Sequence, residues 1–131
     1  MILLDTHIWI WWVSQSPQLT PTLTQHIQQQ QQNRLGVSII SCWEVAKLVE
    51  IGKLQLTFPI ATWLSQALAY PGVQLLDLSV PIVVEATQLP GTFHRDPADQ
   101  LIVATARIYN IPLLTVDAKI LNYPHVQTLT A

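Results

Sequence analysis

Acidic residues stand at five positions where they could form a chemical site. They lie where predicted strands end or predicted helices begin, and they are Asp5, Glu44, Asp96, Asp99 and Asp117. In an open parallel sheet, ligands bind at the carboxyl ends of the strands, so Asp5 and Asp117 would point toward one edge. Helices that follow the strands begin on that edge, where the first turn favours a carboxylate, and we place Glu44 and Asp99 there. The sequence therefore predicts that these carboxylates converge on one pocket.

The surroundings of these acids indicate a bound cation. Asp99 shares a predicted helix face with Ile102 and Val103, and Glu44 shares one with Leu48. An ionised carboxylate turned toward an apolar core is costly unless it is paired. The chain has only six Lys and Arg residues as partners, whereas one divalent cation would satisfy several carboxylates together. Oxygen-only ligands select Mg²⁺ or Mn²⁺ over zinc.

Each acid also has a structural explanation of its own. Glu44 follows Ser41 at the spacing of a capping box, and Asp96 before a proline is a predicted N-cap. Asp5 and Asp117 could simply end strands, as turn residues do. Together, these explanations require separate coincidences to place most of the chain's acids on one sheet edge. We therefore favour the metal site.

The elements that would position these acids alternate along the chain. Predicted strands cover residues 1–5, 35–39, 73–78 and 111–116, and predicted helices cover residues 6–14, 20–33, 41–51, 59–70, 81–89 and 96–110. Alternating short apolar strands and helices form βαβ units with right-handed crossovers. The expected fold is α/β, with a central parallel sheet of about four to five strands flanked by helices.

Length and composition are those of one intracellular domain. The 131 residues suit a single hydrophobic core, since half of them are hydrophobic and 11% are charged. The net charge is −2 and the basic residues form no stripe, which argues against a protein that coats DNA. The lone Cys42 has no partner for a disulfide or a zinc site. Without a membrane-length apolar run or a signal peptide, we expect a cytoplasmic protein and no membrane association.

Five motifs together resemble a known family. They are Leu3-Leu4-Asp5-Thr6-His7, Ser38 through Ser41 to Trp43-Glu44-Val45-Ala46-Lys47, His94-Arg95-Asp96-Pro97-Ala98-Asp99, Leu101-Ile102-Val103-Ala104-Thr105-Ala106 and Leu113-Leu114-Thr115-Val116-Asp117. In order and spacing this set, which spans nearly the whole chain, resembles the PIN-domain nucleases. Within them it is similar to the VapC-type toxins of bacterial toxin–antitoxin pairs. The resemblance implies a single PIN domain over residues 1–131.

The resemblance also implies a metal centre. The family's four metal-site acids fall on Asp5, Glu44, Asp99 and Asp117, with Asp96 as an accessory acid or the cap of the Asp99 helix. Asp5 and Asp99 would be the principal ligands. The implied activity is Mg²⁺- or Mn²⁺-dependent hydrolysis of RNA phosphodiester bonds, with these four acids as catalytic residues and no other cofactor. The implied partners are an RNA substrate, a cognate antitoxin protein and a second copy of the chain in a homodimer.

Two other functions stay open at this point. A catalytically silent PIN-like module would only bind a partner, although all four acids are retained. An aspartyl phosphotransferase or phosphatase would use Asp5 as its nucleophile, but its pattern requires a second aspartate where His7 stands. The chain departs from many relatives at Gln100, where they carry arginine, and in its small number of basic residues. The RNA target, its cleavage sequence, the number of metal ions and the antitoxin's identity are not encoded in motif spacing.

Hydroxyl and aromatic side chains near the acids complete the predictions. Thr6 and Thr115 each stand beside an acid and are candidates to donate a hydrogen bond to it. The tryptophans are expected mainly to pack in the core or at an interface. An inhibiting partner would lay an apolar helix near Trp9 and Trp12 while its basic group pairs with the carboxylates.

Overall fold

The computed structural model describes residues 1–130 and contains a five-stranded sheet in the order β3-β2-β1-β4-β5. The strands are β1 (Ile2–Leu4), β2 (Leu35–Ser38), β3 (Val73–Leu76), β4 (Leu113–Leu114) and β5 (Thr128–Leu129). Every neighbouring pair is parallel, and β1 lies between β2 and β4. Parallel strands need crossover connections, which the helices between them supply. The predicted α/β fold with a parallel sheet is confirmed.

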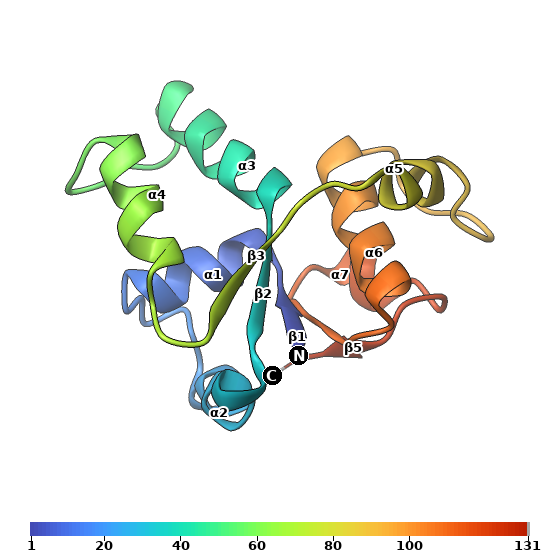
Figure 1. Ribbon diagram of the computed structural model, residues 1–131, viewed down its shortest axis with the longest axis horizontal. Helices are drawn as coiled ribbons and strands as arrows, with labels where there is room; N and C mark the ends of the chain where they lie inside the picture. The colour runs from blue at the N-terminus through green and yellow to red at the C-terminus, as the bar shows by residue number, and fades with distance from the viewer. Residues whose placement is uncertain (131) are drawn as a thin grey trace.

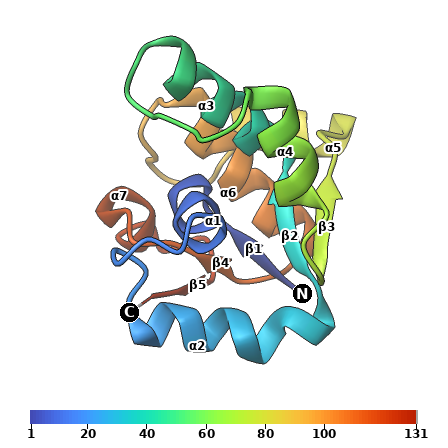
Figure 2. The ribbon, with the colours of Figure 1, turned by 90° about the vertical axis from the view of Figure 1, so that its left-hand side faces the viewer.

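Helices connect the strands and cover both faces of the sheet. They are α1 (Thr6–Val13), α2 (Pro21–Gln30), α3 (Ile39–Glu50), α4 (Ile60–Leu68), α5 (Val80–Thr87), α6 (Pro97–Tyr109) and α7 (Ala118–Leu121), with a 3-10 helix η1 at Gln31–Asn33. Strand side chains alternate between faces, so Ile2 and Leu4 belong to the core formed with α1 to α4, whereas Leu3 belongs to the core formed with α6 and α7. Figure 1 shows α1, α3 and α4 on one side of the strands and α5, α6 and α7 on the other. Figure 2 shows α2 lying across the end of the sheet where β1 begins.

The third helix starts earlier than the sequence predicts. The predicted capping box of Ser41 and Glu44 is wrong, because α3 begins at Ile39 and its N-cap is Ser38. Ser38 ends β2 with an extended backbone (φ −72°, ψ 144°), and its hydroxyl accepts a hydrogen bond from the Ile40 N–H (3.2 Å). Glu44 therefore lies beyond the first turn, and the expectation that it stands at the helix N-terminus is wrong too.

Two short elements near the end of the chain are not predicted from the sequence. Helix α7 has four residues and strand β5 has two, which is too few for a periodic pattern. Strand β5 is defined by its pairing with β4, in which Leu114 lies opposite Leu129. Within residues 1–130, no helix is long and apolar enough to cross a membrane.

Candidate metal centre

Five carboxylates come together at the carboxyl-terminal edge of the sheet. Asp5 follows β1, Asp117 follows β4, Glu44 lies in α3, and Asp96 and Asp99 lie at the start of α6. All five line one cavity of about 400 Å³. The other residues that line this acid cavity are Thr6, His7, Ile8, Trp11 and Val116. The fold thus places side by side the acids that the sequence spreads over more than a hundred positions.

Asp5 is buried and fully hydrogen-bonded. Its Oδ1 accepts a hydrogen bond from the Thr6 N–H (2.8 Å), and its Oδ2 accepts one from the Thr115 hydroxyl (2.7 Å). The Thr115 oxygen in turn accepts a hydrogen bond from the Asp117 N–H (3.0 Å). Burial raises the pKa of Asp5, and the hydrogen bonds from Thr115 and Thr6 oppose that rise. Thr115 therefore joins the ends of β1 and β4 and fixes the positions of two acids.

Glu44 is held by two buried hydroxyl groups. The Thr6 hydroxyl donates to Glu44 Oε1 (2.5 Å), and its oxygen lies 2.8 Å from the Ser41 hydroxyl oxygen. A hydroxyl carries one proton, so when Thr6 donates to the carboxylate, Ser41 is the donor in the second hydrogen bond. Burial raises the pKa of Glu44, the Thr6 hydrogen bond lowers it, and the charges of Asp5 and Asp96 raise it further. Ser41 thus acts on Glu44 through Thr6 and not through a helix cap.

Asp99 lies in the first turn of α6, as predicted. Asp96 is the N-cap of this helix, and its Oδ1 accepts a hydrogen bond from the Asp99 N–H (3.0 Å). Burial raises the pKa of Asp99 to about 7, with further upward contributions from the other four carboxylates of the cavity. A carboxyl group of this kind releases its proton when a cation binds.

His94 approaches the same carboxylate. Its Nε2 lies 2.9 Å from Asp99 Oδ2, and both side chains are mostly buried. This nitrogen makes no well-directed hydrogen bond within residues 1–130, although it lies at ion-pair distance from the carboxylate. The side-chain amide of Gln100 donates a hydrogen bond to the His94 carbonyl (3.1 Å). Gln100, which stands where many relatives carry arginine, therefore holds the segment that contains His94. The sequence carried no signal for His94 beyond its place two residues before Asp96.

The donor set fits Mg²⁺ or Mn²⁺. The acid cavity offers carboxylate oxygens, and no lysine or arginine lines it. Within residues 1–130, no three Asp, Glu, His or Cys side chains already lie in an arrangement that could hold a metal ion. The carboxylates instead accept hydrogen bonds from nearby groups, as Asp117 does from the Lys119 N–H (2.8 Å), and they keep further lone pairs. A divalent cation would replace the mutual repulsion of these acids with attraction.

The comparison with known proteins gives the family. Residues 2–126 match the PIN domain family. The chain belongs to the PIN domain family. This PIN domain is 33% identical to Ribonuclease VapC22 of Mycobacterium tuberculosis over 129 residues, which make up 98% of this chain and 96% of the relative.

Solved structures share the fold of this PIN domain. VapBC2 from Rickettsia felis, bound to a DNA fragment from its promoter, has a TM-score of 0.71 at 19% identity, covering 99% of this chain and 98% of that chain. A toxin–antitoxin complex from Klebsiella pneumoniae has a TM-score of 0.62 at 18% identity, covering 99% and 97%. The predicted membership of this family is confirmed.

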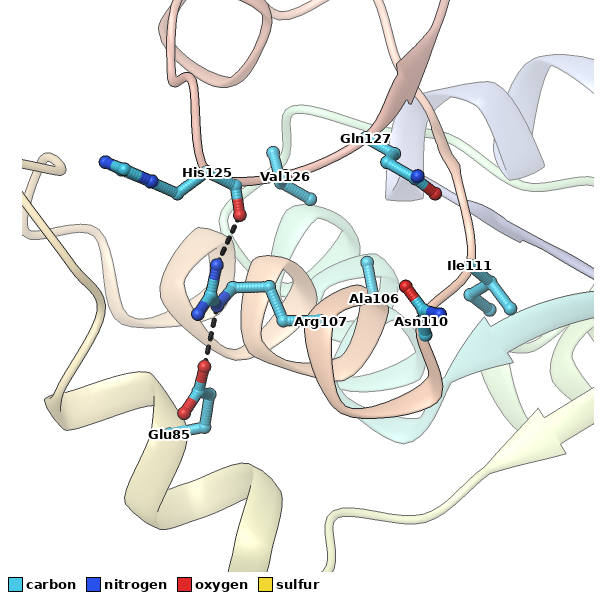
Figure 3. A pocket seen from close by; sticks show the side chains of 8 residues that line it. All are labelled: Glu85, Ala106, Arg107, Asn110, Ile111, His125, Val126 and Gln127. Atoms are coloured by element: carbon cyan, nitrogen blue, oxygen red, sulfur yellow. Dashed lines mark hydrogen bonds and ion pairs between the residues drawn. The ribbon is translucent and has the colours of Figure 1, made fainter.

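Two basic residues of the PIN domain are paired with acids away from the acid cavity. Lys47 pairs with Glu50 (2.5 Å), and Arg107 Nε pairs with Glu85 Oε2 (2.6 Å). Arg107 also donates to the His125 carbonyl (2.5 Å), and Figure 3 shows it bridging α5 and that segment beside a separate cavity of about 200 Å³. No acid of the candidate centre lines this separate cavity.

The tryptophans of the PIN domain divide into buried and exposed sets. Trp9 is fully buried and packs edge to face on Trp63, with ring centroids 5.2 Å apart. A partner in a groove near Trp9 and Trp12 therefore cannot contact the Trp9 ring itself. Trp12 is partly exposed and packs on Tyr70, with centroids 5.3 Å apart. Trp43, by contrast, has 56% of its surface exposed.

Proposed function

We propose that this PIN domain is a divalent-metal-dependent ribonuclease and the toxin of a type II toxin–antitoxin system. The observation that carries the proposal is the cavity lined by Asp5, Glu44, Asp99 and Asp117, to which no lysine or arginine contributes. The near-full-length relative named as a ribonuclease supports RNA as the substrate. Oxygen-only ligands favour Mg²⁺ or Mn²⁺ as the ion.

Asp5, Glu44, Asp99 and Asp117 would hold the ion. When bound, the ion would polarise the phosphate, lower the pKa of water and neutralise the leaving oxygen. Asp5 and Asp99 would be the principal ligands. Two hydrogen bonds fix the carboxylate of Asp5, and the charges of the other four acids repel the carboxylate of Asp99, so that a cation would relieve this repulsion. Glu44, fixed by Thr6, and Asp117 would complete the shell or orient the attacking water.

The sequence around Asp5 disfavours a phosphotransferase. Such an enzyme would use Asp5 as its nucleophile and would need a second aspartate two residues on. The position two residues on is His7, so no second aspartate can serve as the acid.

The proposal is tested by chelation. Purified protein should cleave single-stranded RNA with Mn²⁺ or Mg²⁺ and should lose this activity with EDTA, because uncompensated carboxylates repel phosphate. The Asp99→Asn variant should cleave at least about 100-fold more slowly, since it loses a principal ligand. Exposed Asp77 lies outside the cavity, so Asp77→Asn is the matched control and should cleave at the wild-type rate. Cleavage that persists after complete chelation would refute the proposal.

The partner proposed for this toxin is an antitoxin with an apolar helix and a basic side chain. A groove of about 270 Å³, lined by both apolar and polar side chains, lies between the end of α1, the segment before α4, and α4 itself. Among the residues that line it are Val13, Leu56, Phe58, Trp63 and Tyr70. Amphipathic helices dock in such grooves, and a basic group at the acid cavity would block the ion. The toxin–antitoxin complex with the same fold supports such a partner.

Phe58→Ala should weaken antitoxin binding about 30-fold, since the ring is half exposed and lines the groove. Trp43→Ala removes a large exposed ring elsewhere and should leave binding unchanged. Changing the antitoxin's basic residue to alanine should restore RNA cleavage with a smaller loss of affinity. Titration calorimetry and cleavage assays on the same samples measure both effects. Inhibition that survives loss of the basic residue would contradict this arrangement.

We also propose that residues 1–131 form one domain that works as a homodimer in the cytoplasm. The described strands belong to one sheet, which supports the single domain. Val80, Val83 and Val84 share one face of α5 and are all exposed, which supports a protein interface there. A dimer would bring a second set of basic side chains near the RNA.

A further inference from the structure

A cavity different from the one beside Arg107 adjoins the acid cavity. It has a volume of about 460 Å³ and lies between α1 and the end of α3 with the turn that follows. We call it the α1–α3 cavity. Its lining residues are His7, Ile10, Trp11, Ser14, Ser16, Gln18, Leu48, Lys53 and Leu54. His7 and Trp11 also line the acid cavity, so the two cavities meet at these side chains.

The α1–α3 cavity has the opposite charge to its neighbour. No acid lines it, and Lys53 contributes an ammonium group. The Lys53 N–H donates to the Leu48 carbonyl (2.9 Å), which fixes the backbone from which the exposed side chain extends. The carboxylates of the acid cavity repel a phosphate, whereas Lys53 of the α1–α3 cavity attracts one. Phosphate contacts of this kind position a nucleic acid without selecting its sequence.

The apolar part of the α1–α3 cavity suits a planar ring. Trp11 is partly exposed, and its ring lies beside that of His7, with centroids 6.1 Å apart. Stacking on an aromatic side chain stabilises a bound base and accepts any of the four bases, because each has a flat π face. At the far end, the Ser16 oxygen accepts a hydrogen bond from the Gln18 N–H (3.2 Å), which leaves the Ser16 proton free to donate.

We infer that the α1–α3 cavity binds one nucleotide of the RNA next to the bond that is cut, with its base on Trp11 and its phosphate at Lys53. The inference rests on the proposed ribonuclease function. The volume lies within the roughly 300–1,000 Å³ of small-ligand sites. An RNA strand that crosses from one cavity to the other at His7 and Trp11 brings a neighbouring phosphodiester to the carboxylates.

The experiment measures RNA binding without cleavage. A short fluorescein-labelled single-stranded RNA is titrated with the Asp99→Asn protein in Mn²⁺, and fluorescence anisotropy gives the Kd. Adding Lys53→Ala should raise the Kd about tenfold and lower the slope of log K against log salt by about 0.7, since one phosphate contact is lost. Adding Trp11→Ala should raise the Kd about tenfold, whereas Trp11→Phe, which keeps a stacking ring, should retain most of the affinity.

Matched controls separate this site from general charge and folding effects. Lys47→Ala removes an exposed lysine and Trp43→Ala an exposed tryptophan, neither of which lines the cavity, and both should leave the Kd unchanged. In the wild-type background, Lys53→Ala should raise KM and leave kcat unchanged. Suppose that wild-type protein cleaves RNA, but the Lys53→Ala and Trp11→Ala variants bind RNA as tightly as their parent or lose affinity only for the antitoxin. The inference is then wrong and the proposed function stands. If wild-type protein neither binds nor cleaves RNA, both fall.

Discussion

The carboxyl group of Asp99 lies among four others, and burial together with their charges raises its pKa from 3.8 to about 7. The folded, metal-free protein therefore binds a proton at this group more tightly than the unfolded chain does. By linkage, the stabilising effect of that proton is fully present below about pH 4 and is lost as the pH rises through about 7. Above that pH the charged group destabilises the metal-free fold.

Asp99→Asn should therefore stabilise the metal-free protein at about pH 8 by about 1–3 kcal/mol, and the gain should vanish near pH 4. Asparagine keeps the size of the side chain and removes its charge. Urea denaturation in EDTA at the two pH values measures the difference in free energy of unfolding. Asp77→Asn, at an exposed acid outside the site, should change stability at neither pH. A less stable Asp99→Asn protein at pH 8 would mean that the side chain is structural.

The acids could be predicted from the sequence because they are rare and stand at element boundaries. With eight acids in 131 residues, Asp5, Asp96, Asp99 and Asp117 at strand ends or helix starts form a visible pattern, and Glu44 joined them only through a misplaced helix start. Ser41 and His94 could not be found in the same way. A serine three residues before a glutamate can cap a helix, or it can reach the glutamate through a third side chain, as Ser41 does through Thr6. Only the packing of α1 against α3 decides between these two roles.

Between elements, the packing of α1 on α3 determines where Glu44 points. Thr6 begins α1 and Ser41 lies in the first turn of α3, so their hydroxyl pair joins the two helices beside the carboxylate. Hydroxyl groups that orient a metal ligand typically contribute 10–100-fold to affinity or activity. The packing of α1 on α3 therefore orients Glu44, a proposed metal ligand, through the hydroxyl groups of Thr6 and Ser41.

Thr6→Val should lower RNA cleavage about tenfold and weaken Mn²⁺ binding, since Glu44 loses its donor while the side-chain volume is kept. Thr6→Ser, which keeps the hydroxyl, should restore most of both. Thr105 is a matched control, because it is also buried and its hydroxyl donates to the Leu101 carbonyl within α6 (2.7 Å). Calorimetry with Mn²⁺ and a cleavage assay provide the two readouts. Equal losses in Thr6→Val and Thr105→Val would point to a general cost of a buried hydroxyl.

Long elements with caps were predictable, and short elements were not. Helix α6 carries Asp96 as its cap and a proline at its first position, and both signals are local. Strand β5 has two residues that become a strand only by pairing with β4, which is a long-range fact. The start of α3 was misplaced because Ser38 and Ser41 are both good caps, and the end of β2 decides between them.

At the scale of the whole molecule, three exposed apolar side chains form a stripe along α5. Val80, Val83 and Val84 are exposed along one face of this helix, and Leu75 of the edge strand β3 is also exposed. An apolar stripe in water has a cost that a second copy can remove by covering it. This stripe is the surface that supports the proposed homodimer.

Val83→Glu should convert the dimer to a monomer, because the interface would have to bury an unpaired carboxylate. Sedimentation velocity over a range of concentrations measures the change, and the dissociation constant should rise at least about tenfold. Ile51→Glu is the matched control, since Ile51 is exposed at the end of α3 and lies outside the stripe. A wild-type protein that sediments as a monomer at all concentrations would refute the dimer, as would an unchanged Val83→Glu dimer.

The hydrogen bond between Thr115 and Asp5 joins residues 110 positions apart, nearly the full length of the chain. A ribosome that is making this protein must therefore release almost all of it before Asp117 can meet Asp5 beside β1. Until then the nascent chain lacks both a ligand of the proposed ion and the strand that positions it. We therefore expect the proposed nuclease to stay inactive until its synthesis is nearly complete, and a product shortened before β4 to lack cleavage activity.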